Sequence, residues 1–300
     1  MRNFKNSLLE RALKSSAKIY LPETDDKRVE EAISELIKLG FNVVDHQSLN
    51  DNINIYKQII SEKKFTLNWS DKMKDDFLNS NLNYGLAALQ NNDIDCLVAG
   101  ANHSTSDILK STIRIIGVGK KTNWISSSFF MISSNNNNLY TFSDCGVIPE
   151  PNSQQLCSIA YEASKLHKLL SDDEPIVAFL SFSSKGSAEH YKCKKVREAH
   201  KLFSEKYPNI VSDGEIQFDA AINKSVSVKK GSSINGQANV FIFPDLDSAN
   251  IAYKITQYLG GYQALGPLLQ GLNKPVHDLS RGCSVDDIIY VSSIAAIQKI

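Results

Sequence analysis

The stretch CLVAGANHSTSDILKSTIRII, residues 96–116, decides the fold. An apolar strand, CLVAG, runs into a polar turn with His103, Ser104 and Thr105, and apolar positions at helical spacing follow. In α/β sheets ligands bind at the carboxyl ends of strands, where the next helix offers free N–H groups to an anion. The turn is therefore a candidate phosphate site, with Ser104 and Thr105 as its residues. Either hydroxyl would serve equally well as a helix N-cap, with His103 an ordinary turn residue.

The same alternation extends to both sides of this stretch. It predicts strands over residues 16–21, 41–44, 96–98, 176–182 and 240–243, a β-rich segment over 124–131, and helices over 29–39, 83–89 and 105–116. Strands that alternate with helices predict parallel sheets. We expect a two-domain α/β protein with a cleft. The Asn-rich run 135–138 and the stretch 224–236 are expected to be surface turns or insertions.

Composition excludes several classes of function. The chain has 300 residues and equal numbers of basic and acidic residues, 33 each, so its formal net charge is zero. That balance removes the broad positive surface with which nucleic-acid binders neutralise phosphates. This length fits one to three domains. Small-molecule partners are favoured over nucleic acid.

Cysteine usage and hydropathy point to a cytoplasmic protein without a membrane span. The five cysteines form no CxxC pair and their number is odd, so neither a disulfide framework nor a zinc site is indicated. The N-terminal residues are helical and amphipathic, without a signal-peptide core. No window approaches the ~20 apolar residues that a membrane span needs.

The glycine-rich stretch 260–287 contains five glycines and two prolines. We expect the backbone to turn sharply there and to leave Asn273, His277, Asp278, Ser280 and Arg281 on loops, where function often lies. Only six arginines stand beside 27 lysines, so an arginine in this stretch is a candidate for bidentate anion binding.

The last helix is expected to begin at Ser284, its N-cap. Asp286 and Asp287 would lie in its first turn, where an acid supports the capping box and the helix dipole. The segment FSSKGSAEH, residues 182–190, superficially suggests a phosphate cradle. It lacks the P-loop pattern, so an ordinary turn with a solvated lysine is the simpler interpretation.

Taken together, several segments resemble the phosphate acetyltransferase family. They are LPE at 21–23 with Arg28, LVAGANHSTSDIL at 97–109, SSFFM at 127–131, LSFSSKGSAEH at 180–190, DGEIQFDAA at 213–221, ANVFIFPDLDSANIAYKITQYLGG at 238–261, and GPLLQGLNKPVHDLSRGCSVDDI at 266–288. The resemblance keeps the same order over nearly the whole chain and is most specific in the C-terminal half.

This resemblance implies two α/β domains of the isocitrate/isopropylmalate-dehydrogenase-like fold, with mainly parallel sheets, flanking helices and a cleft between the domains. Domain I would comprise residues 1–122 and 268–300, and domain II residues 123–267. It further implies a cytoplasmic homodimer that transfers an acetyl group reversibly between coenzyme A and phosphate. Coenzyme A and acetyl-CoA, phosphate and acetyl phosphate would be substrates, with no metal and no bound cofactor.

The resemblance also implies roles for individual residues. Asp287 would be the base that takes the thiol proton of coenzyme A, which then attacks directly in a ternary complex. Ser280 and Arg281 would hold the phosphate and carbonyl oxygens, with Cys283 a neighbour and not a nucleophile. The implied substrate-binding residues are Ser104, Thr105, Lys110, Ser127, Ser128, Asn273 and Cys283.

Two departures from the family pattern stand out. The RKHKG-type motif that precedes the helix around residues 83–89 is absent, and residues 60–80 contain no arginine. Only Lys63 and Lys64 could substitute for it. A second arginine of the family corresponds to Lys110 in this chain. Lysine keeps the positive charge but lacks the paired N–H donors of a guanidinium group. Arg114, one helical turn later, could compensate.

Two alternatives stay open on the sequence. One is a phosphate acyltransferase for butyryl or another short chain, and another is a catalytically weakened domain that senses acetyl-CoA. A dehydrogenase is disfavoured despite the shared fold, because no G-x-G-x-x-G follows a strand.

Overall fold

The computed structural model describes residues 4–119, 122–135 and 138–299. The chain forms two compact units: Met1–Asn123 with Leu272–Ile300 is unit 1, and Trp124–Gly271 is unit 2. Unit 1 is therefore built from two distant segments of the chain. No helix in the described part is both long and apolar enough to cross a membrane.

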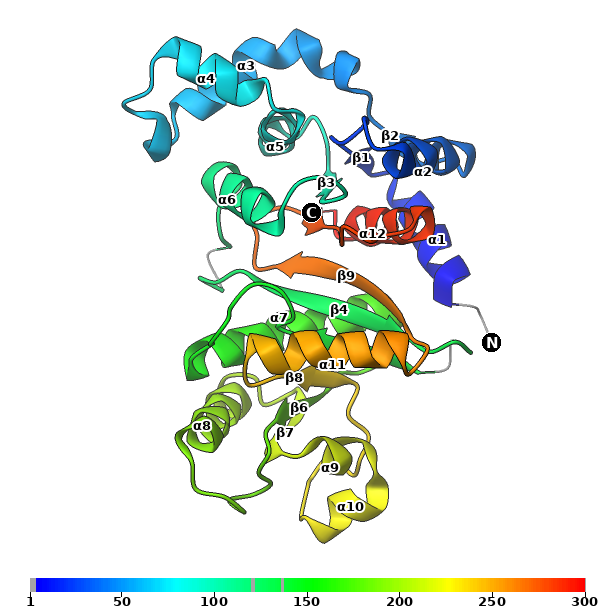
Figure 1. Ribbon diagram of the computed structural model, residues 1–300, viewed down its shortest axis with the longest axis vertical. Coiled ribbons are helices and arrows are strands. Elements are labelled where there is room, and N and C mark those ends of the chain that lie inside the picture. Colours follow the sequence, from blue (N-terminus) through cyan, green and yellow to red (C-terminus); the bar gives the residue numbers. More distant parts are fainter. Residues whose placement is uncertain (1–3, 120–121, 136–137, 300) are drawn as a thin grey trace. The chain divides into compact units, whose positions relative to one another are not determined.

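Unit 1 is a four-stranded parallel sheet in the order β10-β3-β1-β2 with helices packed on it. Its elements are α1 (Phe4–Ser15), β1 (Lys18–Tyr20), α2 (Lys27–Lys38), β2 (Asn42–Val43), the 3-10 helix η1 (His46–Asn52), α3 (Ile53–Ser61), η2 (Lys64–Thr66), α4 (Asp71–Leu78), α5 (Asn81–Asn91), β3 (Cys96–Ala99), α6 (Thr105–Ile115), β10 (Val276–Asp278) and α12 (Val285–Ile297). The C-terminal α12 packs against α1, α2 and β3 (Figure 1).

Local sequence explains how these helices form and pack. In α2, Asp26 caps the first turn, and the buried residues Val29, Ala32 and Leu36 recur at helical spacing on one face. In α5, Gly85 permits close approach to the sheet, because a Cβ there would lie 2.4 Å from the Tyr20 ring. Small or regularly spaced apolar residues thus bring these helices onto the sheet.

Unit 2 is a six-stranded mixed sheet in the order β7-β6-β8-β5-β4-β9. Its elements are β4 (Ser126–Ile132), β5 (Leu139–Ser143), α7 (Ser153–Ser171), β6 (Ile176–Leu180), α8 (Tyr191–Lys206), β7 (Val211–Ile216), α9 (Phe218–Ile222), α10 (Lys224–Lys229), β8 (Val240–Ile242), α11 (Leu246–Tyr258) and β9 (Gln263–Gln270). Strand β4 runs antiparallel to both of its neighbours, whereas β7, β6, β8 and β5 are parallel.

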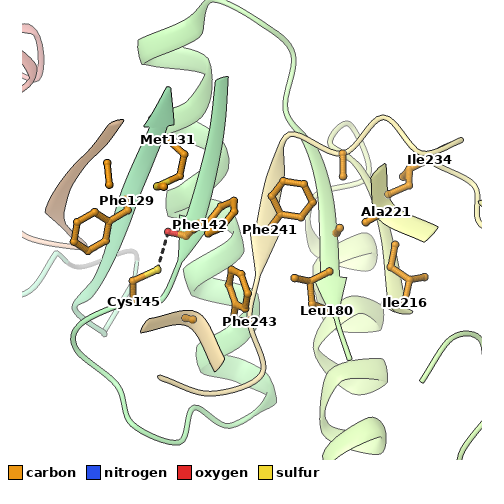
Figure 2. Close-up of a cluster of buried hydrophobic side chains, with 14 residues drawn as sticks. Phe129, Met131, Phe142, Cys145, Leu180, Ile216, Ala221, Ile234, Phe241 and Phe243 are labelled. Carbon is orange, nitrogen blue, oxygen red and sulfur yellow. Dashed lines mark hydrogen bonds between the residues drawn. The ribbon is translucent and has the colours of Figure 1, made fainter. Parts of the chain in front are cut away.

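Alternating side chains bury both faces of the unit 2 sheet. Val177 and Phe179 of β6 pack with α7 and α8. Ala178 and Leu180 of the same strand belong to a second core with Phe241, on the side of α9 and α11. Figure 2 shows this second core. A strand buried on both faces reads as a continuous apolar run, which is how β6 and β8 appear in the sequence.

Three expectations are corrected by the fold. His277 and Asp278 do not lie on a loop but are fully buried in β10, because this segment pairs with β3. The glycine-rich stretch also contains the eight-residue strand β9, which its apolar residues build against β4. The stretch 224–236 begins with a short helix, α10, capped by Asn223.

Candidate functional site

Three loops of unit 1 follow the parallel strands β1, β3 and β10, so they emerge at the same edge of the sheet. They are residues 21–26, residues 100–104 and residues 279–284. The strands bring together segments that lie almost 80 and more than 170 residues apart. Most of the sequence-predicted site residues are in the last two loops and in the helices that follow them.

The side chain of Glu23 fills the turn after β3. It is 2% exposed. Its Oε2 accepts the backbone N–H groups of Gly100 and Ala101, both at 2.8 Å, and Oε1 accepts those of Asn102 at 2.9 Å and His103 at 2.7 Å. Burial alone would raise the pKa of Glu23, but hydrogen bonds from this turn outweigh it and lower the pKa. The anion that these four amides bind is therefore part of the protein.

Arg28, at the start of α2, joins all three loops. Its guanidinium forms a bidentate contact with Asp26, at 3.0 and 2.7 Å. It also donates to the carbonyl oxygens of Ala101 at 3.2 Å, Arg281 at 2.8 Å and Cys283 at 3.0 Å. The planar, five-donor guanidinium suits such a junction. Arg28 thus fixes the backbone around the candidate catalytic residues.

A second buried carboxyl, that of Asp278, connects β10 to the start of α6. Its Oδ2 accepts the Thr105 hydroxyl at 2.6 Å, and Oδ1 has no hydrogen-bond partner among the described residues. Burial is the main reason that the pKa of Asp278 rises to about 6. Gly100 is needed opposite it, because a Cβ there would lie 2.3 Å from Asp278 Oδ1. Thr105, predicted to bind substrate, is thereby anchored at this edge of the sheet.

Residues 280–284 form a tight turn that leads into α12. The Cys283 amide donates to the Ser280 carbonyl at 2.9 Å, and Ser280 and Arg281 are exposed. Ser284 and Asp287 form a reciprocal capping box, with Ser284 N and Oγ at 3.0 and 2.8 Å from Asp287 Oδ2. The predicted N-cap is confirmed. Asp287 therefore has a structural role at the start of α12.

The start of α6 is capped by Ser104. Its Oγ accepts the Asp107 amide at 3.2 Å and donates to the Asp107 carboxylate at 2.7 Å. The N-cap interpretation of Ser104 is confirmed. The amides of Thr105 and Ser106 lie in the first turn, ahead of any intrahelical acceptor.

Other predicted residues are not part of these loops. The Asn273 amide donates to the Ile116 carbonyl at 3.0 Å, at the far end of α6, about 16 Å from its start. Lys110 is exposed midway along the helix. Ser127 and Ser128 are buried in β4 of unit 2, where Ser127 donates to Asp144 at 2.7 Å. The structure gathers Ser280, Arg281, Asp287, Ser104 and Thr105 in one unit.

Two of the three residues considered as substitutes for the missing arginines, Lys63 and Arg114, contact other groups of unit 1. Lys63 donates to the Ile115 carbonyl at 2.5 Å, and burial lowers its pKa. The Arg114 guanidinium lies 5.3 Å from the Phe65 ring centre, beside an aromatic cluster with Trp69 and Phe77. The Lys63 ammonium group is therefore bound to the backbone, whereas Arg114 is exposed and contacts the Phe65 ring.

The thiol of Cys283 is poorly suited to nucleophilic attack. The residue is 6% exposed, and burial raises its pKa to about 11 despite the nearby Arg28 charge. All five cysteines are buried and unpaired. Within the described residues, no group of three or more histidine, cysteine or acidic side chains could hold a metal ion.

Sequence reasoning missed the roles of Glu23 and Arg28. Both residues belong to the segments that carry the resemblance, but the sequence alone gives neither of them a contact. The available signal was their position: a carboxylate and an arginine follow the first strand of a parallel sheet, at the edge where the other loops emerge.

The comparisons with known proteins agree along the full chain. The family model "Phosphate acetyl/butaryl transferase" matches residues 38–296. A phosphate acetyltransferase of Staphylococcus aureus is 40% identical, with 100% of both chains covered, and one of Acetivibrio thermocellus is 38% identical, with 99% of this chain and 98% of the relative covered. A solved phosphotransacetylase from Streptococcus pyogenes superposes with a TM-score of 0.89 at 34% identity, covering 99% of this chain and 98% of that one.

Proposed function

The chain belongs to the phosphate acetyl/butaryl transferase family, and from that premise we propose how its unit 1 site carries out the reaction. It is an enzyme that transfers an acetyl group between coenzyme A and phosphate, like the phosphate acetyltransferases that it matches over nearly their full length. The proposed mechanism is direct attack of the coenzyme A thiolate on acetyl phosphate in a ternary complex, and the reverse. One observation carries the assignment of the site: Arg28 fixes the turn of Ser280 and Arg281 against the turn after β3.

In this proposal Asp287 is the base. A free thiol with a pKa near ~8.5 is mostly protonated at neutral pH, and only the thiolate is a good nucleophile. The capping box with Ser284 holds the Asp287 carboxylate in the first turn of α12, seven residues after Ser280. The capping box therefore gives the base a fixed position relative to Ser280 and Arg281.

Ser280 and Arg281 stabilise the negative charge that develops on the carbonyl and phosphate oxygens. Both are exposed, so they are available to a substrate, and Arg28 holds the Arg281 carbonyl in place. Oriented donors that need no rearrangement at the moment of reaction are among the strongest contributions to catalysis. The amides of Thr105 and Ser106 at the start of α6 are the proposed contacts for phosphate.

The decisive assay mixes purified protein with acetyl phosphate and coenzyme A and follows the thioester absorbance, with butyryl phosphate in parallel. We expect turnover with acetyl phosphate to exceed that with butyryl phosphate. Turnover with butyryl phosphate alone would assign the longer acyl chain. No turnover, together with calorimetric binding of acetyl-CoA, would instead identify a sensor.

Four further proposals rest on family membership. The units correspond to two domains, the active protein is a homodimer, and it works in the cytoplasm on coenzyme A and phosphate without a bound cofactor. The relatives and the solved neighbour are covered almost completely by this chain, which supports these proposals. Light scattering of the purified protein tests the homodimer, activity after chelator treatment tests the absence of a metal cofactor, and cell fractionation tests the location.

A further inference from the structure

His103 and Glu23 form a carboxylate–imidazole pair beside the site. His103 Nδ1 lies 2.7 Å from Glu23 Oε1, the oxygen that also accepts the His103 backbone amide. Glu23 is almost fully buried, whereas the His103 side chain is 33% exposed. Because Glu23 is ionised at neutral pH, it can only accept, and Nδ1 of His103 must therefore carry the hydrogen.

This tautomer makes the other ring nitrogen an acceptor. Nε2 forms no hydrogen bond within the described residues, and it is absent from their buried unpaired side-chain atoms, so it reaches solvent. Four backbone amides hold the Glu23 carboxylate, and the carboxylate in turn orients the ring. The same logic, a fixed acid behind a histidine, makes an imidazole a good general base.

The position of the ring suits a phosphate substrate. His103 immediately precedes Ser104, the N-cap of α6, and the positive end of an eleven-residue helix favours an anion there. Two residues before it, the Ala101 carbonyl shares the Arg28 guanidinium with the carbonyls of Arg281 and Cys283. The ring and the turn that carries Arg281 therefore belong to one hydrogen-bonded frame.

We propose that His103 is the acid–base group for the phosphate substrate and that Glu23 is its positioning residue. The inference rests on the proposed acetyl transfer. When acetyl phosphate forms, HPO₄²⁻ attacks acetyl-CoA: a phosphate oxygen bonds to the carbonyl carbon, the carbon–sulfur bond breaks, and the phosphate proton passes to Nε2. The sulfur leaves with the bonding electron pair and takes a proton from Asp287. Exchange with water then resets both groups, and the reverse direction runs the same transfers backwards.

Two substitutions of His103 separate chemistry from structure. In His103→Asn the side-chain amide can still donate to Glu23 in place of Nδ1, but no basic nitrogen remains. In His103→Gln the amide replaces Nε2 and the bond to Glu23 is lost. We expect both to lower kcat by about 10²-fold or more in either direction, with the KM for coenzyme A unchanged. The urea midpoint should stay at the wild-type value in His103→Asn and fall in His103→Gln.

Imidazole rescue is a measurement that would give no effect if His103 had only a structural role. In His103→Ala, added imidazole should restore at least about tenfold of the lost kcat, as a base of the missing type. It should restore none in Asp287→Asn. The matched control is His46→Asn, because His46 in the same unit also bonds a neighbour through Nδ1, the Tyr20 hydroxyl at 2.7 Å. That variant should keep the wild-type kcat.

The outcomes distinguish this inference from the proposed function. Wild-type kcat in His103→Asn, with loss only in the destabilised His103→Gln, overturns the inference and makes the pair a structural bond of the turn. Failure of imidazole to rescue His103→Ala also overturns it. If the wild-type protein transfers no acetyl group, the proposed function itself fails.

Discussion

Two strand-to-helix turns, one in each unit, have the sequence character of anion cradles, and each is filled by a buried carboxylate of the protein. In unit 1 Glu23 accepts four backbone amides of residues 100–103. In unit 2 Glu215, 0% exposed, accepts the Gly186 amide at 2.9 Å and the Ser183 hydroxyl at 2.8 Å. Lys185 in this second turn has a positive φ of 50° and pairs with Asp213.

The two turns differ in which groups contact each carboxylate. Glu23 uses both oxygens on backbone amides and holds a half-exposed imidazole beside α6. Within the described residues the second oxygen of Glu215 forms no hydrogen bond, and Arg197 Nε lies 3.6 Å from it. A turn that binds an internal anion is a rigid support, and substrate must then be bound by the side chains and helix amides next to it. We therefore expect substitutions in the unit 1 turn to affect catalysis and those in the unit 2 turn to affect stability.

The largest effect should come from Asp287, the proposed base in unit 1. Asp287→Asn removes the proposed base but keeps an oxygen for the cap, so kcat should fall ~10²- to 10⁴-fold with little change in KM. Steady-state assays in both directions measure this.

Two controls bracket that prediction. Ser284→Ala breaks the capping box and should cost about 1 kcal/mol of stability, with a smaller fall in kcat than Asp287→Asn because the base itself remains. Asp286→Asn should be nearly normal. A crippled Asp286→Asn beside an active Asp287→Asn would move the base by one residue.

The next effect compares the two carboxylates directly. Glu23→Gln turns an NH₂ group toward backbone donors, whereas Glu215→Gln can keep its oxygen on Ser183 and Gly186. We expect losses of about 3 and about 1 kcal/mol in the free energy of unfolding. Equal losses in the free energy of unfolding for Glu23→Gln and Glu215→Gln, measured by urea titration, would refute the distinction between the turns.

The pH dependence of Glu23→Gln has a defined sign. Because folding lowers the pKa of Glu23 below its ordinary 4.5, its stabilisation is present above that pH and is lost as the pH falls through the folded value. The difference in the free energy of unfolding between wild type and Glu23→Gln should therefore become smaller at acidic pH.

Asp278, next to Glu23, should behave oppositely. Its pKa is raised to about 6 from 3.8, so the wild type loses stability as the pH rises from about 4 to about 6. Relative to wild type, Asp278→Asn should gain about 2 kcal/mol between pH 4.5 and pH 7.5. A pH-independent difference between the two urea curves would mean that Asp278 titrates normally.

A smaller effect is expected at Arg281. Arg281→Lys keeps the charge but loses two parallel hydrogen bonds, so kcat/KM should fall at least about tenfold, or ~1.4 kcal/mol. The matched change in the unit 2 turn, Lys185→Arg, should leave kcat/KM within about twofold because Asp213 still has a cation. Full activity of Arg281→Lys would reduce its role to charge alone.

The smallest effect concerns Lys110. If this lysine contacts an anionic substrate, KM should rise with ionic strength, because exposed charges are screened by salt. Lys110→Arg should then improve kcat/KM by a few-fold. A salt-independent KM and no gain would remove Lys110 from the binding site.

The sequence allowed accurate prediction where the signal is local. The helix starts at Ser104 and Ser284 follow from capping chemistry within four residues, and β6 and β8 follow from continuous apolar runs. The strand β10 was missed because Val276, His277 and Asp278 look like a polar loop, and only pairing with β3 explains their burial. Apart from the Arg28–Asp26 pair, the side-chain contacts of Glu23 and Arg28 span 73 to 255 residues, so no local pattern encodes them.

The discontinuity of unit 1 has a consequence during synthesis on the ribosome. Unit 2 lies on one continuous segment, Trp124–Gly271, and can fold as soon as it emerges. Strand β3 gains its neighbour β10, and α1 and α2 gain α12, only when Leu272–Ile300 has been made. Until then β3 is an unprotected edge in a half-built sheet. We therefore expect a chain released before residues 280–284 have been made to be inactive and prone to aggregate, even if its second unit has folded.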